Sequence, residues 1–361
     1  MPKTILIMAG GTGGHVFPGI AVANELSARG WQVHWLGTPK RMEAQLVPKA
    51  GFEISFIDVE GVRGNGMLRI LAAPFKILQA ILAAYRVIRQ VKPDVVLGMG
   101  GFASGPGGIA AWLRGIPLVV HEQNAIPGLT NKWLSKIANR VLCGFNNGFE
   151  QLQSEQKKYH WVGNPVRKDF MQIANKQAHD SALKILIVGG SLGAKALNEH
   201  VPLALSQCVN LEVKHQCGKG HVDDVIARYQ TSLGDKYSWQ VVEFIDDMAS
   251  AYDWADIVIC RAGALTVAEV AMAGVVAIFV PLPHAVDDHQ TLNAKALSDA
   301  NAAYLLPQSE LQQGELSNLL NQVISDPQKR IDVGAKARTL AKSQATESVS
   351  DICEQLGGMA A

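Results

Sequence analysis

Three times along this chain, a short apolar run leads directly into a cluster of glycines and then into a helical pattern. The runs are Thr4–Met8, Asp94–Leu97 and Leu183–Val188, and the clusters that follow them are Gly10–His15, Gly98–Gly108 and Gly189–Ala194. This strand–loop–helix order predicts parallel sheets with crossover helices. The chain is therefore expected to have an α/β fold.

The strand pattern stops and begins again near the middle of the chain. A Gly-Asn-Pro sequence at 163–165 and a polar segment separate the two series. A chain of 361 residues, 48% of them hydrophobic, is long enough for two buried cores. We predict two Rossmann-like, doubly wound parallel-sheet domains, 1–163 and 164–341, that face a cleft. A C-terminal helix, 342–361, is expected to pack on the first domain.

Composition excludes several classes of protein. The net charge of +1 provides no global field for nucleic acid. The five cysteines have no zinc-ligand spacing, and the adjacent Asp287 and Asp288 lack partners at the spacing of a metal site. We therefore predict no metal and no cofactor. The apolar run at the N-terminus is too short for a signal peptide, so a soluble protein in a reducing compartment is expected.

The first glycine cluster, Gly10–His15, is a candidate phosphate or sugar site. Glycines let a backbone approach a ligand closely, and a helix N-terminus attracts negative charge. A dinucleotide fingerprint does not fit, because its third glycine falls on Val16 and no acid follows the second strand to hold a ribose. A tight structural turn is the alternative. His15 is a candidate general base, since neutral imidazole accepts a proton, or a structural histidine.

Two further polar segments follow strands of the first half. In Gly98–Gly108, the backbone amides and Ser104 are candidates for holding a second phosphate-bearing substrate, and a structural turn is the alternative. After the strand Leu118–Val120, Glu122 is a candidate for orienting a histidine or binding a hydroxyl. Asn124 is expected either to bind a sugar hydroxyl or to cap a helix.

The second half carries two more candidate loops. Gly189–Ala194 matches the Gly-x-Ser-x-Gly turn of α/β-hydrolases, with Ser191 as the nucleophile, which keeps a serine hydrolase open. A hydrolase would not need the glycine loops of the first half, and Ser191 at a helix N-terminus suits a phosphate. In Arg261–Glu269 the amides are expected to point at a diphosphate. Glu269 is expected to accept hydrogen bonds from ribose hydroxyls or to cap a helix, and Gln290 to bind a sugar hydroxyl.

One segment, from Gly61 to Pro93, contains no acidic residue. Basic side chains alternate there with large apolar ones, among them Ile70, Leu71, Phe75, Lys76 and Leu78. A basic, apolar helix can lie on an anionic membrane surface. A buried crossover helix with a solvated basic face is the alternative.

Taken in their order, these motifs resemble the family 28 glycosyltransferases of bacterial peptidoglycan synthesis, over nearly the whole chain. Val16–Gly19 and Gly163–Arg167 match that family as well. The resemblance implies a GT-B fold, anomeric inversion and a nucleotide site that needs no metal. The implied enzyme is a hexosyltransferase. It moves N-acetylglucosamine from UDP-GlcNAc to the C4 hydroxyl of lipid I, the undecaprenyl-diphosphate-linked muramyl-pentapeptide, giving lipid II and UDP.

The resemblance also implies roles for individual residues. Near the donor sugar and phosphates it places Thr12, Gly13, Gly14, Asn124 and Arg167. It assigns the diphosphate to Ser191, uracil to the backbone of Ile245 and GlcNAc to Gln290. It assigns the rest of the diphosphate and ribose contacts to Ala264, Leu265, Thr266, Val267, Ala268 and Glu269. The candidate catalytic residues are then His15 and Glu122, and the candidate acceptor contacts are Gly100, Gly101 and Ser104.

The basic apolar segment matches the membrane-docking region of that family. The implied location is the cytoplasmic face of the inner membrane, with anionic lipid and other cell-wall synthesis proteins as partners. Three alternatives stay open. One is an epimerase or glycolipid synthase that uses a UDP-sugar on the same fold. The others are a serine hydrolase and a protein that binds a nucleotide sugar without turning it over.

Overall fold

The structure is a computed structural model that describes residues 2–59, 67–152, 154–177, 179, 181–190, 193–283 and 288–358. For residues 67–73 and 152 only the course of the chain is described. The chain divides into two compact units. The first comprises Met1–Arg167 and Ser343–Ala361, and the second comprises Lys168–Lys342. The first unit thus runs four residues beyond the boundary at 163 that the sequence suggested.

The first unit is built on a parallel sheet in the order β3-β2-β1-β4-β5-β6-β7. Its strands are β1 Thr4–Ala9, β2 Gln32–Gly37, β3 Glu53–Phe56, β4 Val95–Gly100, β5 Leu118–Glu122, β6 Arg140–Cys143 and β7 Tyr159–Trp161. Its helices are α1 Gly13–Ala28, α2 Glu43–Lys49, α3 Met67–Val91, α4 Ser104–Leu113, α5 Leu129–Ile137, the 3-10 turn η1 Glu150–Leu152 and α14 Ala345–Gly358.

The second unit is built on a parallel sheet in the order β10-β9-β8-β11-β12-β13. Its strands are β8 Leu183–Val188, β9 Leu211–Gln216, β10 Ser238–Val242, β11 Ile257–Cys260, β12 Val276–Phe279 and β13 Tyr304–Leu305. Its helices are η2 Lys168–Gln172, α6 Lys195–Leu205, α7 Val222–Ser232, α8 Met248–Trp254, α9 Ala264–Ala273, α10 His289–Ser298, α11 Gln308–Gln312, α12 Glu315–Ser325 and α13 Pro327–Thr339. The predicted α/β class with two parallel sheets is confirmed.

Strand β1 shows why such runs of consecutive apolar residues form central strands. Successive side chains of a strand point to opposite faces of the sheet. Ile5 and Ile7 pack into a core with residues of α1 and α14, whereas Leu6 and Met8 pack into a second core with residues of α3 and α4. Both faces of the sheet are therefore covered, as is usual for parallel sheets.

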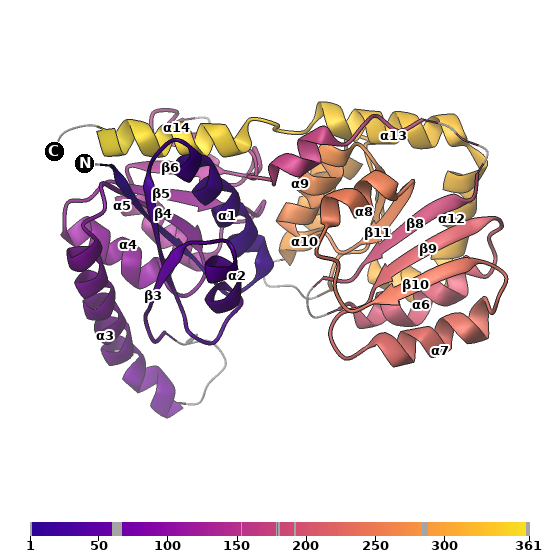
Figure 1. Ribbon diagram of the computed structural model, residues 1–361, viewed down its shortest axis with the longest axis horizontal. Helices are drawn as coiled ribbons and strands as arrows, with labels where there is room; N and C mark the ends of the chain where they lie inside the picture. The colour runs from indigo at the N-terminus through magenta and orange to yellow at the C-terminus, as the bar shows by residue number, and fades with distance from the viewer. Residues whose placement is uncertain are drawn as a thin grey trace. The chain divides into compact units, whose positions relative to one another are not determined.

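Helix α14 is the last element of the chain, yet it belongs to the first unit (Figure 1). Val349, Cys353 and Leu356 complete the core that β1 and α1 share. Arg29, at the end of α1, forms ion pairs with Asp351 at 2.6 Å and with Glu354 at 2.7 Å. These contacts fix α14 on the face of the sheet that α1 covers.

Each sheet has one point at which the chain reverses the direction in which it adds strands. This point lies between β1 and β4 in the first unit and between β8 and β11 in the second. Loops at the carboxyl ends of such neighbouring strands leave a crevice where ligands bind. The loops that follow these four strands are the ones the sequence singled out, so the fold brings them together in pairs, one pair in each unit.

Candidate active site

The two glycine loops of the first unit touch each other through their backbones. Gly101 has a positive φ of 86°, and a Cβ at this position would clash with the carbonyl group of Gly10. Gly100 also has a positive φ, and a Cβ there would lie 2.9 Å from Cδ2 of His15 and 3.7 Å from Nδ2 of Asn131. Only glycine permits this approach. The imidazole of His15 and the side-chain amide of Asn131 therefore both lie beside Gly100, at the end of β4.

Glu122 organises the loop that follows β5. Its Oε1 accepts hydrogen bonds from the backbone and side-chain nitrogens of Asn124, at 2.9 and 3.2 Å. Its Oε2 accepts hydrogen bonds from the backbone N–H of Gly128 at 3.0 Å and from Nδ2 of Asn131 at 2.9 Å. The carboxylate is almost completely buried. It thus places Asn124 and also Asn131, which flanks the same backbone as His15.

Ser104 lies within the protein and does not face solvent. Its hydroxyl donates toward the carbonyl groups of Met8 at 2.8 Å and Gly100 at 2.7 Å, and it accepts a hydrogen bond from the N–H of Gly100 at 3.1 Å. The sequence suggested an acceptor contact for this residue. In the structure its hydroxyl instead joins the loop after β4 to the end of β1.

Sequence reasoning missed Glu43, the first residue of α2. This fully buried carboxylate accepts hydrogen bonds from the N–H of Gly11 at 3.0 Å and from the backbone and hydroxyl of Thr38 at 3.0 and 2.7 Å. It therefore joins the first glycine loop to the loop after β2. Thr12, Gly13 and Gly14 follow directly, at the N-terminus of α1.

A buried polar network holds the segment around Gly163 beside β5. Burial lowers the pKa of His121 to about 4, so its imidazole is neutral. Its Nε2 donates to the carbonyl of Gly163 at 2.9 Å, and its Nδ1 accepts from the side-chain amide of Gln123 at 3.1 Å. The guanidinium of Arg167 lies 5.6 Å from the ring centre of Phe17, in α1. Arg167, predicted to contact the donor, is thus held next to the helix that begins with Gly13.

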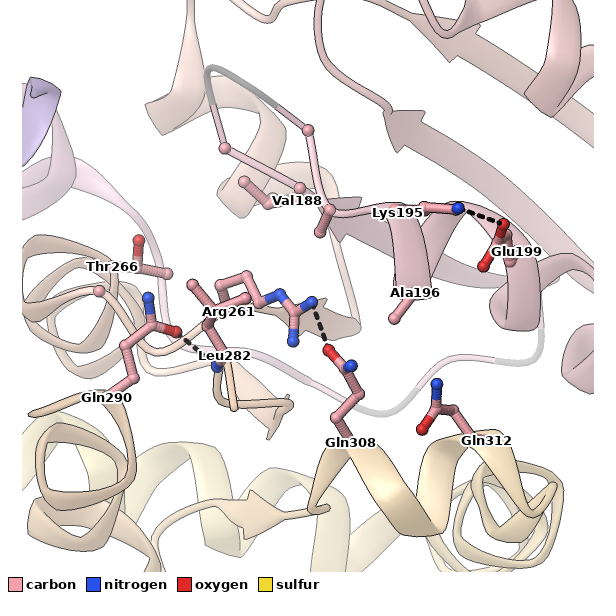
Figure 2. Close-up of a pocket in the computed structure, with 15 residues that line it drawn as sticks. Val188, Lys195, Ala196, Glu199, Arg261, Thr266, Leu282, Gln290, Gln308 and Gln312 are labelled. Atoms are coloured by element: carbon pink, nitrogen blue, oxygen red, sulfur yellow. Dashed lines mark hydrogen bonds and ion pairs between the residues drawn. The ribbon is translucent and has the colours of Figure 1, made fainter. Parts of the chain in front are cut away.

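A pocket of about 590 Å³ opens in the second unit, at the switch point between β8 and β11. Glycine backbone, the basic residues Lys195 and Arg261, and several side-chain amides surround it (Figure 2). The lining residues are Val188, Gly189, Gly190, Gly193, Ala194, Lys195, Ala196, Glu199, Arg261, Gly263, Thr266, Leu282, Gln290, Gln308 and Gln312. Exposed amides and cations are suited to an anionic ligand such as a diphosphate.

Arg261 is held rigidly in the wall of this pocket. Its Nη1 donates to the carbonyl groups of Val280 and Pro281, each at 3.0 Å. Its Nη2 donates to Oε1 of Gln308 at 2.7 Å, as Figure 2 shows. Partial burial lowers the pKa of the guanidinium from its usual value. An arginine side chain nevertheless keeps its proton at neutral pH. The pocket therefore contains a fixed positive charge.

The loop after β8 needs its glycines for close packing. A Cβ at Gly193 would clash with the carbonyl of Cys217, and a Cβ at Gly189 would lie 3.0 Å from the carbonyl oxygen of Gln216. Gly190 and Gly193 both have positive φ angles. Ser191, predicted to bind the diphosphate, lies outside the described residues.

Of the predicted donor contacts in the second unit, Thr266 and Gln290 line the pocket. Oε1 of Gln290 accepts a hydrogen bond from the N–H of Leu282 at 3.0 Å. Glu269 lies largely buried on α9, and Ile245 follows β10. The pocket is not lined by Ile245, Ala264, Leu265, Val267, Ala268 or Glu269.

The pocket also contains residues that sequence reasoning did not assign. Lys195 and Glu199, four residues apart on α6, lie 3.8 Å apart as an ion pair (Figure 2). Gln308 and Gln312 have the same spacing on α11. This i, i+4 spacing places each pair on one helix face, and it is the signal in the sequence that could have identified them.

The described residues contain no group of three or more histidine, cysteine, aspartate or glutamate side chains that could hold a metal.

Helix α3 is buried on one face only. Ala84 and Ile88 pack into the core with α4, and Ala80 is buried as well, whereas Phe75 is 65% exposed and Leu78 is 52% exposed. Lys76 is exposed as well, and the side chains of Ile70 and Leu71 lie outside the described residues. Exposed apolar side chains also occur at the end of α4, on Trp112 and Leu113, and on α5, on Leu129 and Trp133.

Two parallel sheets, each covered by helices and each with glycine loops at its switch point, form a fold of the GT-B type. The model of the glycosyltransferase family 28 N-terminal domain matches residues 5–143, and that of the glycosyltransferase family 28 C-terminal domain matches residues 184–356. The chain belongs to glycosyltransferase family 28.

Curated relatives match along nearly their whole length. A protein of Pseudoalteromonas atlantica is 60% identical over 99% of this chain and 96% of its own, and one of Aeromonas hydrophila is 55% identical over 99% and 98%. Both are named UDP-N-acetylglucosamine–N-acetylmuramyl-(pentapeptide) pyrophosphoryl-undecaprenol N-acetylglucosamine transferase.

Solved structures show the same fold. The crystal structure of Acinetobacter baumannii MurG is 47% identical and has a TM-score of 0.82, covering 98% of this chain and 100% of that one. The UDP-GlcNAc 2-epimerase of Neisseria meningitidis, bound to UDP-GlcNAc, is 15% identical with a TM-score of 0.67, covering 97% of this chain and 98% of that one. The epimerase thus shares the fold.

Proposed function

We propose that this protein transfers N-acetylglucosamine from UDP-GlcNAc to the C4 hydroxyl of lipid I, forming lipid II and releasing UDP. The observation that carries the proposal is the pocket of the second unit, where Arg261 and glycine backbone line a space suited to a diphosphate. Membership of family 28 and the printed activity of relatives that are 55–60% identical support the same substrates.

The proposed reaction is a direct displacement at the anomeric carbon of GlcNAc. His15 accepts the proton of the acceptor hydroxyl, the oxygen forms a bond to the anomeric carbon, and the bond to the UDP oxygen breaks with inversion. Arg261 and the amides at the N-termini of α6 and α9 stabilise the charge that develops on the departing diphosphate. Such preorganised electrostatic stabilisation is often the largest contribution to catalysis.

Glu122 contributes by positioning. Its four hydrogen bonds fix Asn124 and Asn131, and the amide of Asn131 lies against the backbone that His15 also contacts. We infer that Glu122 holds the first-unit site in shape and that Asn124 contacts the donor sugar. Its carboxylate already accepts four hydrogen bonds, which leaves it poorly suited to accept a substrate proton.

A single transfer assay tests the proposed function. The protein is incubated with radiolabelled UDP-GlcNAc and a lipid I analogue in detergent or vesicles. We expect label in the lipid and an equal amount of released UDP. Epimerised UDP-sugar without lipid labelling would indicate an epimerase, and a fluorophosphonate adduct at Ser191 would indicate a hydrolase. Binding of UDP-GlcNAc without formation of any product would indicate a non-enzymatic nucleotide-sugar-binding protein.

We further propose that the protein works at an anionic membrane surface, reached through the exposed apolar side chains of α3. No described helix combines the length and apolar character needed to cross a bilayer. Phe75 and Leu78 are exposed beside Lys76, and Arg86 and Arg89 are exposed further along α3. Apolar side chains that insert below the headgroups, together with nearby cations, are typical of peripheral membrane binding.

Replacing both Phe75 and Leu78 with serine should weaken binding to vesicles that contain phosphatidylglycerol by about tenfold or more, because each side chain loses its burial in lipid. Flotation with increasing vesicle concentration measures this. The control is Val209→Ser, a 68% exposed apolar residue of the second unit. Transfer to a short-chain, water-soluble acceptor should stay unchanged. Equal flotation of the double variant and the wild type would contradict the membrane assignment.

A further inference from the structure

Gln216 is the last residue of β9, which lies between β8 and β10. Its side chain is 3% exposed, although a glutamine side chain usually faces solvent. A buried amide must find hydrogen-bond partners, since an unpaired one is costly. The partners of Gln216 come from the loops on both of its sides.

The side chain holds the loop after β8 at Gly190. Its Oε1 accepts a hydrogen bond from the N–H of Gly190 at 2.9 Å, and its Nε2 donates to the carbonyl of the same residue at 2.9 Å. The backbone carbonyl of Gln216 accepts a further hydrogen bond from the N–H of Gly189 at 3.0 Å. Gly189 and Gly190 line the pocket.

The same nitrogen also reaches the loop after β10. Nε2 of Gln216 donates to the carbonyl of Glu243 at 2.7 Å. Glu243 lies two residues before Ile245, and its own Oε1 accepts a hydrogen bond from the N–H of Gly220 at 2.8 Å. One amide group therefore joins the loop at the pocket to the loop that carries the expected uracil contact.

We propose that Gln216 is a positioning residue that sets the spacing between the diphosphate-binding loop and the base-reading loop, so that both engage one UDP. This inference rests on the proposed function. The role needs an acceptor and two donors on one planar group. Glutamate has no donor when ionised and would place a negative charge beside two carbonyl groups, and methionine has the size but neither function.

The test compares Gln216→Met with Gln240→Met, the same substitution at an exposed position of neighbouring β10. Titration calorimetry should show that Gln216→Met binds UDP at least about tenfold more weakly than the wild type, and that Gln240→Met binds UDP with unchanged affinity. The ratio of UDP to ADP affinity should also fall, because the base-reading loop is no longer held in position beside the diphosphate-binding loop. In the transfer assay the KM for UDP-GlcNAc should rise more than kcat falls, since Gln216 touches no reacting atom.

A purely structural role predicts a different outcome. Gln216→Met would then unfold at lower temperature, but its folded fraction would bind UDP within twofold of wild type with the same preference over ADP, which overturns the proposal. If Gln216→Met does not fold, Gln216→Glu keeps the acceptor and serves in its place. A folded Gln216→Glu with wild-type UDP affinity also overturns the proposal. If the wild type itself does not bind UDP, the proposed function fails, and that result is distinct from a failure of the Gln216 inference.

Discussion

Replacing His15 with alanine should lower the turnover of lipid I about a hundredfold or more, with little change in the KM for UDP-GlcNAc. General base catalysis typically contributes a factor of about 10² to 10⁴. The imidazole lies against Gly100 at the carboxyl end of the sheet, so its removal leaves the backbone of both glycine loops in place. The measurement is kcat for UDP release in the presence of a lipid I analogue.

The control for this prediction is His34→Ala, a partly buried histidine on β2 whose Nε2 lies 2.8 Å from the hydroxyl of Ser55. It removes an imidazole from the same unit but away from the glycine loops, so kcat should stay within about twofold of wild type. A His15→Ala variant that retains normal kcat while folded would show that His15 is not the base. In that case His15 would only shape the loop beside Gly100.

Replacing Arg261 with lysine should also lower turnover about a hundredfold, although the charge is kept. The guanidinium donates to two carbonyl groups and to Gln308 at once, and the compact ammonium of lysine cannot reproduce this fork. Loss of one preorganised donor to a developing charge typically costs a factor of about 10² to 10³ in kcat. Steady-state kinetics with varied UDP-GlcNAc measure the change, and the affinity for UDP should fall as well.

Arg330→Lys is the matched control. Nη1 of Arg330 also donates to two backbone carbonyl groups, those of Val323 and Ile324, and Arg330 is buried in the second unit. It does not line the pocket. This substitution should lower the free energy of unfolding by about 1–3 kcal/mol and leave kcat unchanged. Equal losses of turnover in the two variants would mean that Arg261 supports the fold and not the reaction.

The sequence predicted the class of fold because strand, glycine loop and helix recur in a fixed order. It also predicted the loops at both switch points, since glycines after apolar strands are visible without knowledge of the partner strand. The resemblance to family 28 placed Thr266 and Gln290 at the donor, and both line the pocket. These residues lie within or next to the elements whose patterns identify them.

The residues that hold the loops together could not be found from the sequence. Glu43 reaches Gly11 from 32 positions away, and Gln216 reaches Gly190 from 26. Their partners depend on which strands are neighbours and on register, as in the pairing of Gln216 with Val188. Ser104 illustrates the same limit, because the side on which its hydroxyl points depends on how β4 packs beside β1. Glu122, in contrast, could be recognised from the sequence as an acidic residue at the end of a strand. The four donors that surround its carboxylate could not.

The position of α14 has a consequence for synthesis of the chain. The second unit is continuous in sequence, so all of its contacts can form once residue 342 has left the ribosome. The first unit is discontinuous, and the core around β1 stays incomplete until Val349, Cys353 and Leu356 emerge. A nascent chain that stalls before residue 343 therefore exposes apolar surface on α1 and β4, where chaperones and proteases recognise unfinished domains. The first unit is thus the first to be synthesised in part, but the last to be completed.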